Sequence, residues 1–288
     1  MLPLRCGVVG AGTMGAGVAQ CLATSGHEVI VLDPSLTALD AGRSRVAEGL
    51  RLSVLLGNAA PKTADVLGRI EWTVEWDALS AVQFVIECGP EKLPVKQDIF
   101  RMLDQVCPPE TIFASNTSAI PITQLASFTD RPGNVLGMHF MNPAPLKDAV
   151  EVIRAVHTSD STLGVAMELL VSLGKRGIVV GDAAGFVSNR VLMLSVNEAA
   201  FVLAENTASA RQVDDVFRAC LGHPMGPLET ADLIGLDVVL DSLHVLYDHY
   251  DDTKFRPCPL LVNLVHAGHF GRKSGRGFHP YAVAGADK

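Results

Sequence analysis

The chain opens with two short apolar runs separated by a segment of helical character. Residues 5–9 form the first run, and residues 28–33 form a second run that ends in an acidic residue. Between them, a glycine-rich turn at 10–15 leads into the small and apolar residues 16–25, which predict a helix. The order strand, turn, helix, strand predicts two parallel strands joined by a right-handed crossover.

Apolar runs of strand length recur further along. We expect four more strands, at residues 83–87, 111–115, 135–140 and 150–153, with helical segments between several of them. Residues 36–69 also have helical character, but they contain breakers that predict an interrupted segment, namely Gly42, Gly49, Gly57 and Pro61. The alternation predicts the α/β class, with an open, doubly wound sheet of the Rossmann type.

The pattern changes after the apolar residues 177–180. From 186 to about 204, apolar residues recur at helical spacing, and Ser209 to Gln212 has the form of a capping box that opens another helix. Further helices fit 238–250 and 260–267, and the glycine-rich residues 271–277 predict a turn. We therefore expect a sheet domain at 1–184, followed by a smaller all-helical domain at 185–288.

Composition and charge narrow the class of protein. The 288 residues are 48% hydrophobic, enough to build a core in each of two domains. The 23 basic and 31 acidic side chains give a net charge of −8, which disfavours binding to nucleic acids and to membrane surfaces. The apolar stretches are too short to span a membrane. The N-terminus runs directly into the first strand without the pattern of a signal peptide, so we expect a cytoplasmic protein.

Cysteine and histidine give no sign of a metal centre. The cysteines are single and scattered, at Cys6, Cys21, Cys88, Cys107, Cys220 and Cys258. The sequence contains neither a CxxC pair nor an HExxH motif. We expect reduced thiols, and no bound metal.

The glycine-rich turn predicts a dinucleotide site. Gly10, Gly12 and Gly15 provide, in that order, a tight turn, a close backbone approach to a pyrophosphate and close packing of the helix on the strand. Asp33 ends the next strand, 18 positions beyond Gly15, where a carboxylate accepts hydrogen bonds from a ribose diol and repels a 2′-phosphate. The expected cofactor is therefore NAD rather than NADP. Its predicted contacts in this part of the chain are Gly10, Gly12, Thr13, Met14, Gly15 and Asp33.

A second group of polar residues has the chemistry of an acid/base site. Hydride transfer from an alcohol carbon requires loss of the hydroxyl proton, which a neutral imidazole accepts readily near pH 7. His139 stands near the C-terminal end of a predicted strand, where open α/β sheets bind ligands. Glu151 follows twelve residues later and could return beside it on a neighbouring strand, to hold the other ring nitrogen and stabilise the imidazolium. A lone histidine ending a strand is more often structural.

At this point the sequence resembles the 3-hydroxyacyl-CoA dehydrogenase family, including the bacterial 3-hydroxybutyryl-CoA dehydrogenases. The likeness covers nearly the whole chain. Its motifs occur in the family's order: Gly-Ala-Gly-Thr-Met-Gly (10–15), residues 91–96, Ser-Asn-Thr-Ser (115–118), His-Phe-Met-Asn-Pro (139–143), Gly-Phe-Val-Ser-Asn-Arg (185–190), Pro-Met-Gly-Pro (224–227) and Gly-Arg-Lys-Ser-Gly-Arg-Gly-Phe (271–278).

The resemblance implies roles for single residues. It implies a catalytic pair of His139 and Glu151, with Ser118 and Asn189 bonded to the reacting oxygen of an acyl-CoA thioester, in the L (3S) form. It implies further NAD contacts from Glu91, Lys96, Ser118, Asn142 and Lys273. Each residue also has a plainer interpretation: Ser118 would cap the following helix, Asn189 would lie on a helix surface, and the charged residues would be solvated.

The chain departs from the family pattern in two places. Members that bind CoA usually carry a lysine-rich helix after the second strand, whereas residues 36–69 hold five basic and three acidic side chains. This thin positive charge raises the alternative that the acyl group arrives on a carrier protein, as in dehydrogenases of polyketide unit biosynthesis. In addition, Lys147 stands where the family usually has an uncharged residue, so it could pair with a second carboxylate on the substrate.

Two other classes remain open, and one assembly is expected. Dehydrogenases of the same fold that act on sugar acids or carnitine tend to read His-Pro-x-Asn-Pro, against His139-Phe-Met-Asn-Pro143 here. A catalytically silent NAD-binding protein is the alternative outside enzymes. The apolar residues of 186–202 exceed what one helix buries against its own domain, so we expect a homodimer.

Overall fold

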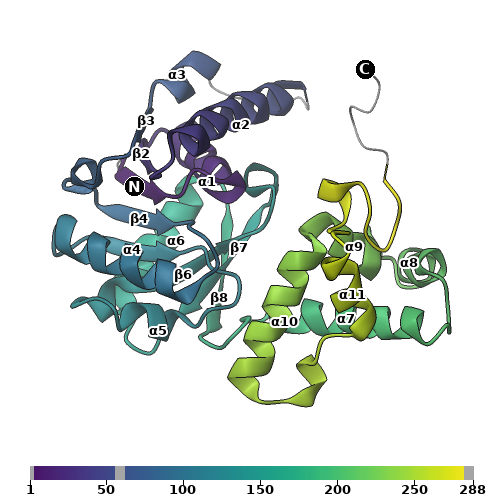
Figure 1. The fold of residues 1–288 in the computed structure, drawn as a ribbon. Coiled ribbons are helices and arrows are strands. Elements are labelled where there is room, and N and C mark those ends of the chain that lie inside the picture. Colours follow the sequence, from purple (N-terminus) through teal and green to yellow (C-terminus); the bar gives the residue numbers. More distant parts are fainter. Residues whose placement is uncertain (1–2, 56–61, 282–288) are drawn as a thin grey trace. The chain divides into compact units, whose positions relative to one another are not determined.

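The computed structural model describes residues 3–55 and 62–281. The chain forms two compact units, residues 1–183 and residues 184–288 (Figure 1). The first unit is an α/β structure and the second is helical in its described residues, so the predicted fold class is confirmed.

The described part of the first unit contains an eight-stranded sheet. In sheet order the strands are β3 (Ile70–Thr73), β2 (Glu28–Leu32), β1 (Arg5–Val9), β4 (Phe84–Glu87), β5 (Ile112–Ser115), β6 (Val135–Phe140), β7 (Ala149–Arg154) and β8 (Arg176–Gly181). Neighbouring strands are parallel except β6 and β7, which are antiparallel. The strand order reverses between β1 and β4, and in such sheets ligands bind outside the carboxyl ends of these two strands.

The strands expected from apolar runs are all present, with ends that differ by one residue at most. The two edge strands, β3 and β8, were not predicted. The sequence of β3, Ile-Glu-Trp-Thr, buries only Ile70 fully, so it has no continuous apolar run, and β8 has no fully buried residue. By contrast, β4 is buried along its whole length, as expected for a central strand covered on both faces.

Helices cover both faces of the sheet (Figure 1). They are α1 (Thr13–Thr24), α2 (Leu36–Leu55), α3 (Thr63–Leu67), α4 (Leu93–Val106), α5 (Ile122–Ala126) and α6 (Asp160–Ser172). Ile86 and Ala114 share one hydrophobic core with residues of α1 and α6. On the opposite face, Phe113 packs edge-on against Phe100 of α4, with ring centroids 6.3 Å apart. Alternate residues of the strands therefore serve two apolar layers.

The expected interruption of the helical segment at Gly42 and Gly49 is wrong, since α2 continues through both. These glycines permit close packing. A Cβ atom at Gly42 would lie 2.7 Å from the Trp72 ring, and one at Gly49 would lie 2.3 Å from the Gln20 amide oxygen. The other two expected breakers, Gly57 and Pro61, lie outside the described residues.

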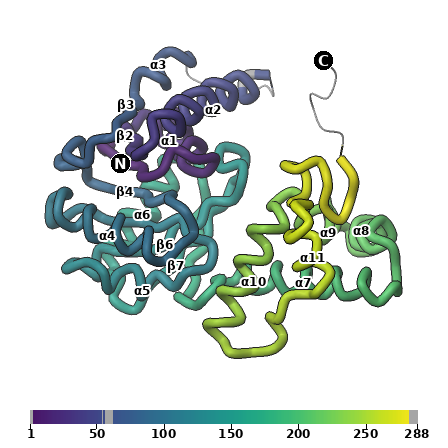
Figure 2. Tube along the Cα trace, in the orientation of Figure 1, coloured from purple at the N-terminus to yellow at the C-terminus, as the bar shows by residue number. Residues whose placement is uncertain are grey.

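The second unit contains five α-helices in its described residues, which the trace in Figure 2 follows in green to yellow. They are α7 (Ser188–Ala204), α8 (Ala210–Ala219), α9 (Pro227–Ile234), α10 (Leu236–Tyr250) and α11 (Pro259–His266). The predicted capping box of Ser209 and Gln212 is present at the start of α8. Helix α9 was not predicted, because eight residues that begin at a proline show little periodicity. Within the described residues, no helix is both long and apolar enough to cross a membrane.

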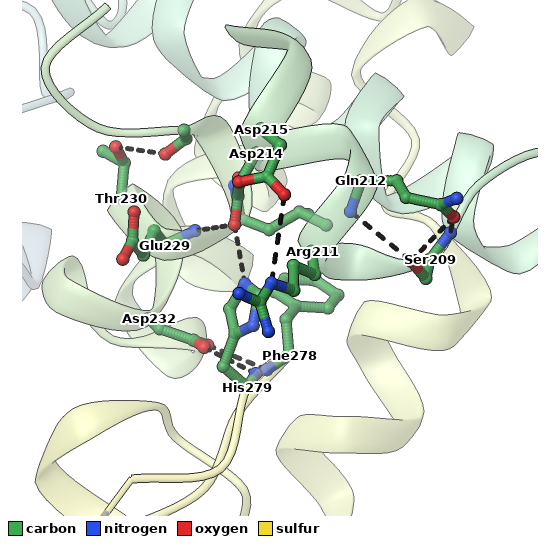
Figure 3. A network of polar contacts seen from close by, with 12 residues as sticks. Ser209, Arg211, Gln212, Asp214, Asp215, Glu229, Thr230, Asp232, Phe278 and His279 are labelled. Carbon is green, nitrogen blue, oxygen red and sulfur yellow. Dashed lines mark hydrogen bonds and ion pairs between the residues drawn. The ribbon is translucent and has the colours of Figure 1, made fainter. Parts of the chain in front are cut away.

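Two buried acids, Asp214 and Asp232, form hydrogen bonds with Phe278 and His279, near the end of the described residues (Figure 3). The carboxylate of Asp214 accepts from two backbone N–H groups in the first turn of α9, and its Oδ2 lies 2.6 Å from Nε2 of His279. Asp232 accepts from the backbone N–H groups of Phe278 and His279, each at 2.9 Å. The turn at residues 271–277 is thereby fixed within the second unit.

Candidate active site

The glycine turn between β1 and α1 has the geometry that a pyrophosphate requires. Gly10 adopts φ of 105°, and a Cβ atom there would lie 2.7 Å from the carbonyl oxygen of Cys88. A Cβ atom at Gly15 would overlap the carbonyl oxygen of Gly10, at 1.8 Å. At Gly12, by contrast, a Cβ atom would meet no atom of the described residues within 4 Å, and this glycine, the N-cap residue of α1, has no side chain to cap the helix. The helix N-terminus is open to an anion there, so these residues fit a dinucleotide.

Asp33 follows β2 and is anchored beside this turn. Its Oδ2 accepts from the backbone N–H of Ala11 and its Oδ1 from that of Ser35, both at 2.9 Å. Each carboxylate oxygen can accept a further hydrogen bond. The half-buried Asp33 therefore has the orientation and the capacity to bind a ribose diol.

His139 and Glu151 are direct neighbours across the antiparallel pair of β6 and β7. Nδ1 of His139 lies 3.1 Å from Oε2 of Glu151, and both residues are buried, with exposed fractions of 5% and 7%. On the other side of the ring, Nε2 lies 3.1 Å from Oγ of Ser118. Because a carboxylate only accepts, an ionised Glu151 places the proton on Nδ1, and Nε2 then accepts from the Ser118 hydroxyl. The strand register thus brings the two residues together as expected.

Glu91 organises the segment that carries Ser118. Its Oε1 accepts from the hydroxyl of Thr117 and from the backbone N–H groups of Ser118 and Ala119, the last two at 2.9 and 3.0 Å. The plainer interpretation of Ser118, a cap on the following helix, does not hold, because α5 begins only at Ile122, with Pro121 at the N-cap position.

Lys96 lies beneath this segment and not at the surface. Its side chain is only 1% exposed, and Nζ donates to both carboxylate oxygens of Glu87, at 2.8 and 2.9 Å, and to the carbonyl oxygen of Gly89, at 3.3 Å. Nζ also lies 3.5 Å from Oε2 of Glu91. Glu87 was missed in the sequence, although an acid that ends an apolar strand, as Asp33 also does, is a usable signal.

Asn142 and Lys147 lie in the loop between β6 and β7, and both are exposed. Asn142 lines a cavity of about 430 Å³, together with residues of α1 and α2 that include Thr13, Arg45 and Glu48. The loop itself is held from below, because the buried Lys175 donates to the carbonyl oxygens of Ala144 and Lys147.

The second unit carries the remaining two candidates. Asn189 is the second residue of α7 and is half-buried. Lys273 lies in the turn after α11, and its Nζ donates to Oδ2 of Asp237 at 2.6 Å. Among the residues that the structure describes, no group of three or more His, Cys, Asp or Glu side chains could hold a metal ion.

The glycine turn at the switch point of the sheet, with Asp33 beside it, defines a dinucleotide-binding protein of the Rossmann class. Sequence models of two domains match the chain: the 3-hydroxyacyl-CoA dehydrogenase NAD binding domain over residues 5–183, and the C-terminal domain of the same family over residues 185–281. The chain therefore belongs to the 3-hydroxyacyl-CoA dehydrogenase family, an NAD-dependent group of oxidoreductases that act on CH–OH, and its cofactor is NAD.

Individual proteins are similar over almost their full length. A probable 3-hydroxybutyryl-CoA dehydrogenase of Bacillus subtilis is 43% identical, over 95% of this chain and 96% of the relative. A structure of Mycobacterium tuberculosis FadB2 superposes with a TM-score of 0.94 at 38% identity, covering 97% of this chain and 100% of that one. For (S)-3-hydroxybutyryl-CoA dehydrogenase PaaH1 of Ralstonia eutropha, the TM-score is 0.91 at 40% identity, covering 98% and 100%.

Proposed function

We propose that this protein catalyses the reversible, NAD-dependent oxidation of a short 3-hydroxyacyl-CoA thioester to the 3-oxoacyl thioester. The observation that carries the proposal is the placement of His139 between Glu151 and Ser118, at the carboxyl end of β6. The names of the similar proteins, 3-hydroxybutyryl-CoA dehydrogenases, support CoA as the acyl carrier and a four-carbon acyl group. The name of the Ralstonia enzyme supports the (S) hydroxy form.

In this mechanism His139 is the general base. Nε2 removes the proton of the substrate hydroxyl, while Glu151 holds Nδ1 and stabilises the imidazolium that forms. The hydroxyl of Ser118 and the amide of Asn189 hydrogen-bond the reacting oxygen and stabilise its developing charge. When bound, NAD accepts the hydride from the substrate carbon.

The cofactor is held mainly by the first unit. The backbone N–H groups at the start of α1, in the turn Gly10, Gly12, Thr13, Met14 and Gly15, bind the pyrophosphate, and Asp33 accepts from the adenosine ribose. Asn142, Ser118 and Lys273 are further proposed contacts. Glu91 and Lys96 contribute chiefly through the segment they organise, since their polar atoms already face protein groups.

The remaining alternatives can be ordered. The names of the relatives favour a CoA thioester over a carrier-protein thioester, and they do not favour a silent NAD binder. Lys147 is exposed and stays a candidate for pairing with a second substrate carboxylate. The homodimer and the cytoplasmic location stay predictions, and light scattering would test the first.

NADH oxidation, followed by absorbance with acetoacetyl-CoA, tests the proposal. We expect turnover by the wild-type protein and its loss in His139→Gln, with NADH binding retained in both. Acetoacetyl linked to a carrier protein is the matched second substrate. Faster turnover of the carrier-linked substrate would contradict the CoA assignment, and turnover of neither substrate would contradict the dehydrogenase activity.

A further inference from the structure

Behind the candidate active site lies a buried ionic cluster formed by Glu87, Lys96 and Glu91. The side chains of Glu87 and Lys96 are 0% and 1% exposed, and that of Glu91 reaches the surface with 36% exposed. Removing charges from water carries a large desolvation cost, which apolar side chains of similar size would avoid. Burial of the cluster therefore lowers the stability of the fold relative to an apolar core. Its contact with the backbone of Ser118 indicates a role in the site.

We propose that Glu87 is a positioning residue, which holds Ser118 against His139 through its contacts with Lys96, Glu91 and Ser115. This inference rests on the proposed function for its catalytic consequence, but the structural claim concerns only residues of the first unit.

The carboxylate of Glu87 is saturated by donors from three directions. Oε1 accepts from the backbone N–H of Gly89 at 2.6 Å, and Oε2 accepts from the hydroxyl of Ser115 at 2.6 Å. Both oxygens also accept from the ammonium group of Lys96. Although burial lowers the pKa of Lys96, the adjacent carboxylates of Glu87 and Glu91 raise it above its ordinary value, so the ammonium stays charged. A fixed cation is thus held between two acids.

The first route from Glu87 to Ser118 runs through this cation. Lys96 lies 3.5 Å from Oε2 of Glu91, and the other oxygen of Glu91 accepts from the backbone N–H groups of Ser118 and Ala119. Glu87 therefore holds the Lys96 ammonium beside the Glu91 carboxylate. The Glu91 carboxylate in turn fixes the backbone of Ser118.

The second route runs through the end of β5. The Ser115 hydroxyl that donates to Glu87 also accepts from the backbone N–H of Thr117, at 3.2 Å, and the backbone N–H of Asn116 donates to the carbonyl oxygen of Glu87 at 2.8 Å. The amide oxygen of Asn116 in turn accepts from the backbone N–H of Phe140, next to His139, at 2.8 Å. Glu87 is thus connected to residues 115–119 at both ends, through Ser115 at the first and through Lys96 and Glu91 at the last.

Two variants test the role of Glu87. Glu87→Gln keeps the size of the side chain, but its amide nitrogen cannot accept from Lys96 or Ser115. Ser115→Ala removes one donor and leaves no buried charge unpaired. We expect kcat with acetoacetyl-CoA to fall by about tenfold or more in Glu87→Gln and by a smaller factor in Ser115→Ala, as for a misplaced catalytic hydrogen bond. KM for NADH should change by a smaller factor than kcat, because neither side chain is itself a proposed cofactor contact and Ser118 is only one of several.

The matched control is Thr111→Val. Thr111 precedes the same strand, is fully buried, and donates its hydroxyl to the carbonyl oxygen of Val82 at 2.8 Å, without a contact to the cluster among the described hydrogen bonds. This variant should lose stability while keeping kcat. Glu87→Asp, which retains the charge, should recover part of the activity that Glu87→Gln loses.

The NMR signals of the His139 ring give a readout that does not need turnover. They should move in Glu87→Gln and Ser115→Ala of the cofactor-free protein, and stay in place in Thr111→Val. If Glu87→Gln fails to fold, Ser115→Ala decides the question. Unchanged kcat and unchanged His139 signals in Ser115→Ala, or equal loss of activity in Glu87→Gln and Thr111→Val, would overturn the inference. If the wild-type protein turns over no hydroxyacyl thioester, the proposed function fails, and the NMR result still decides the positioning role.

Discussion

Replacing Glu151 by glutamine isolates the electrostatic part of the proposed proton transfer. The carboxylate lies 3.1 Å from Nδ1 of His139, and both side chains are buried. Two unit charges about 4 Å apart interact by about 4 kcal/mol at an effective dielectric constant of about 20. If the imidazolium forms in the transition state, loss of this attraction lowers kcat by about a thousandfold, at about 1.36 kcal/mol for each factor of ten. The amide can also donate to Nδ1, which would leave the proton on Nε2 and block the base.

The assay is NAD reduction with 3-hydroxybutyryl-CoA, the direction in which the imidazolium forms, combined with NADH binding measured by fluorescence. We expect kcat to fall by about two to three orders of magnitude, with NADH affinity unchanged. Asp104→Asn is the control, because Asp104 forms an ion pair with Arg131 on a different part of the first unit, and it should leave kcat intact. If Glu151→Gln kept kcat within about threefold of the wild-type value, the acid/base assignment would be refuted.

Three further predictions concern the cofactor site and the core. Asp33→Ala should weaken NAD binding by about tenfold or more, through loss of a charged acceptor, and calorimetric titration of the folded variant checks this. Gly12→Ala should fold normally and bind NAD poorly, because the new Cβ atom would occupy the space at the start of α1 that the pyrophosphate needs. Gly15→Ala should lower the melting temperature, because the new Cβ atom would overlap the carbonyl oxygen of Gly10. Thermal melts and NAD titration together distinguish the two effects. Burial lowers the pKa of His27, whose Nδ1 accepts from a backbone N–H. As the pH falls, the His27 ring is therefore protonated in the unfolded chain before it is protonated in the folded protein, and the free energy of unfolding decreases below a pH of about 6.5. Urea midpoints between pH 7 and 5 should show this loss in the wild-type protein and a smaller loss in His27→Asn.

Most of the fold was accessible from the sequence, because strands buried on both faces leave continuous apolar runs. Strands β3 and β8 and helix α9 were not, since edge strands and a short helix bury too few residues to set a period. The glycines of α2 were misinterpreted for a different reason. Sequence reasoning treats glycine as a break in a helix. Gly42 and Gly49 instead leave room for the side chains of Trp72 and Gln20, which are remote in the chain.

The candidate site divides in the same way. The glycine turn, Asp33 and His139 follow from local patterns at the ends of strands. The pairing of His139 with Glu151 needed the strand register, which the spacing only suggested. The buried position of Lys96 was out of reach, because its partner Glu87 belongs to another element and a lysine alone indicates a solvated side chain.

The antiparallel pairing of β6 and β7 has a consequence for how this enzyme can change. The distance between imidazole and carboxylate is set by a ladder of backbone hydrogen bonds and does not depend on the connection at residues 141–148. Apart from Asn142, a proposed NAD contact, the exposed side chains of that connection can therefore change, Lys147 among them, and new substrate preferences can evolve or be engineered there without a change in the proton-transfer geometry. A slip of one residue between the two strands is the change it cannot tolerate, because the acid would then point through the opposite side of the sheet.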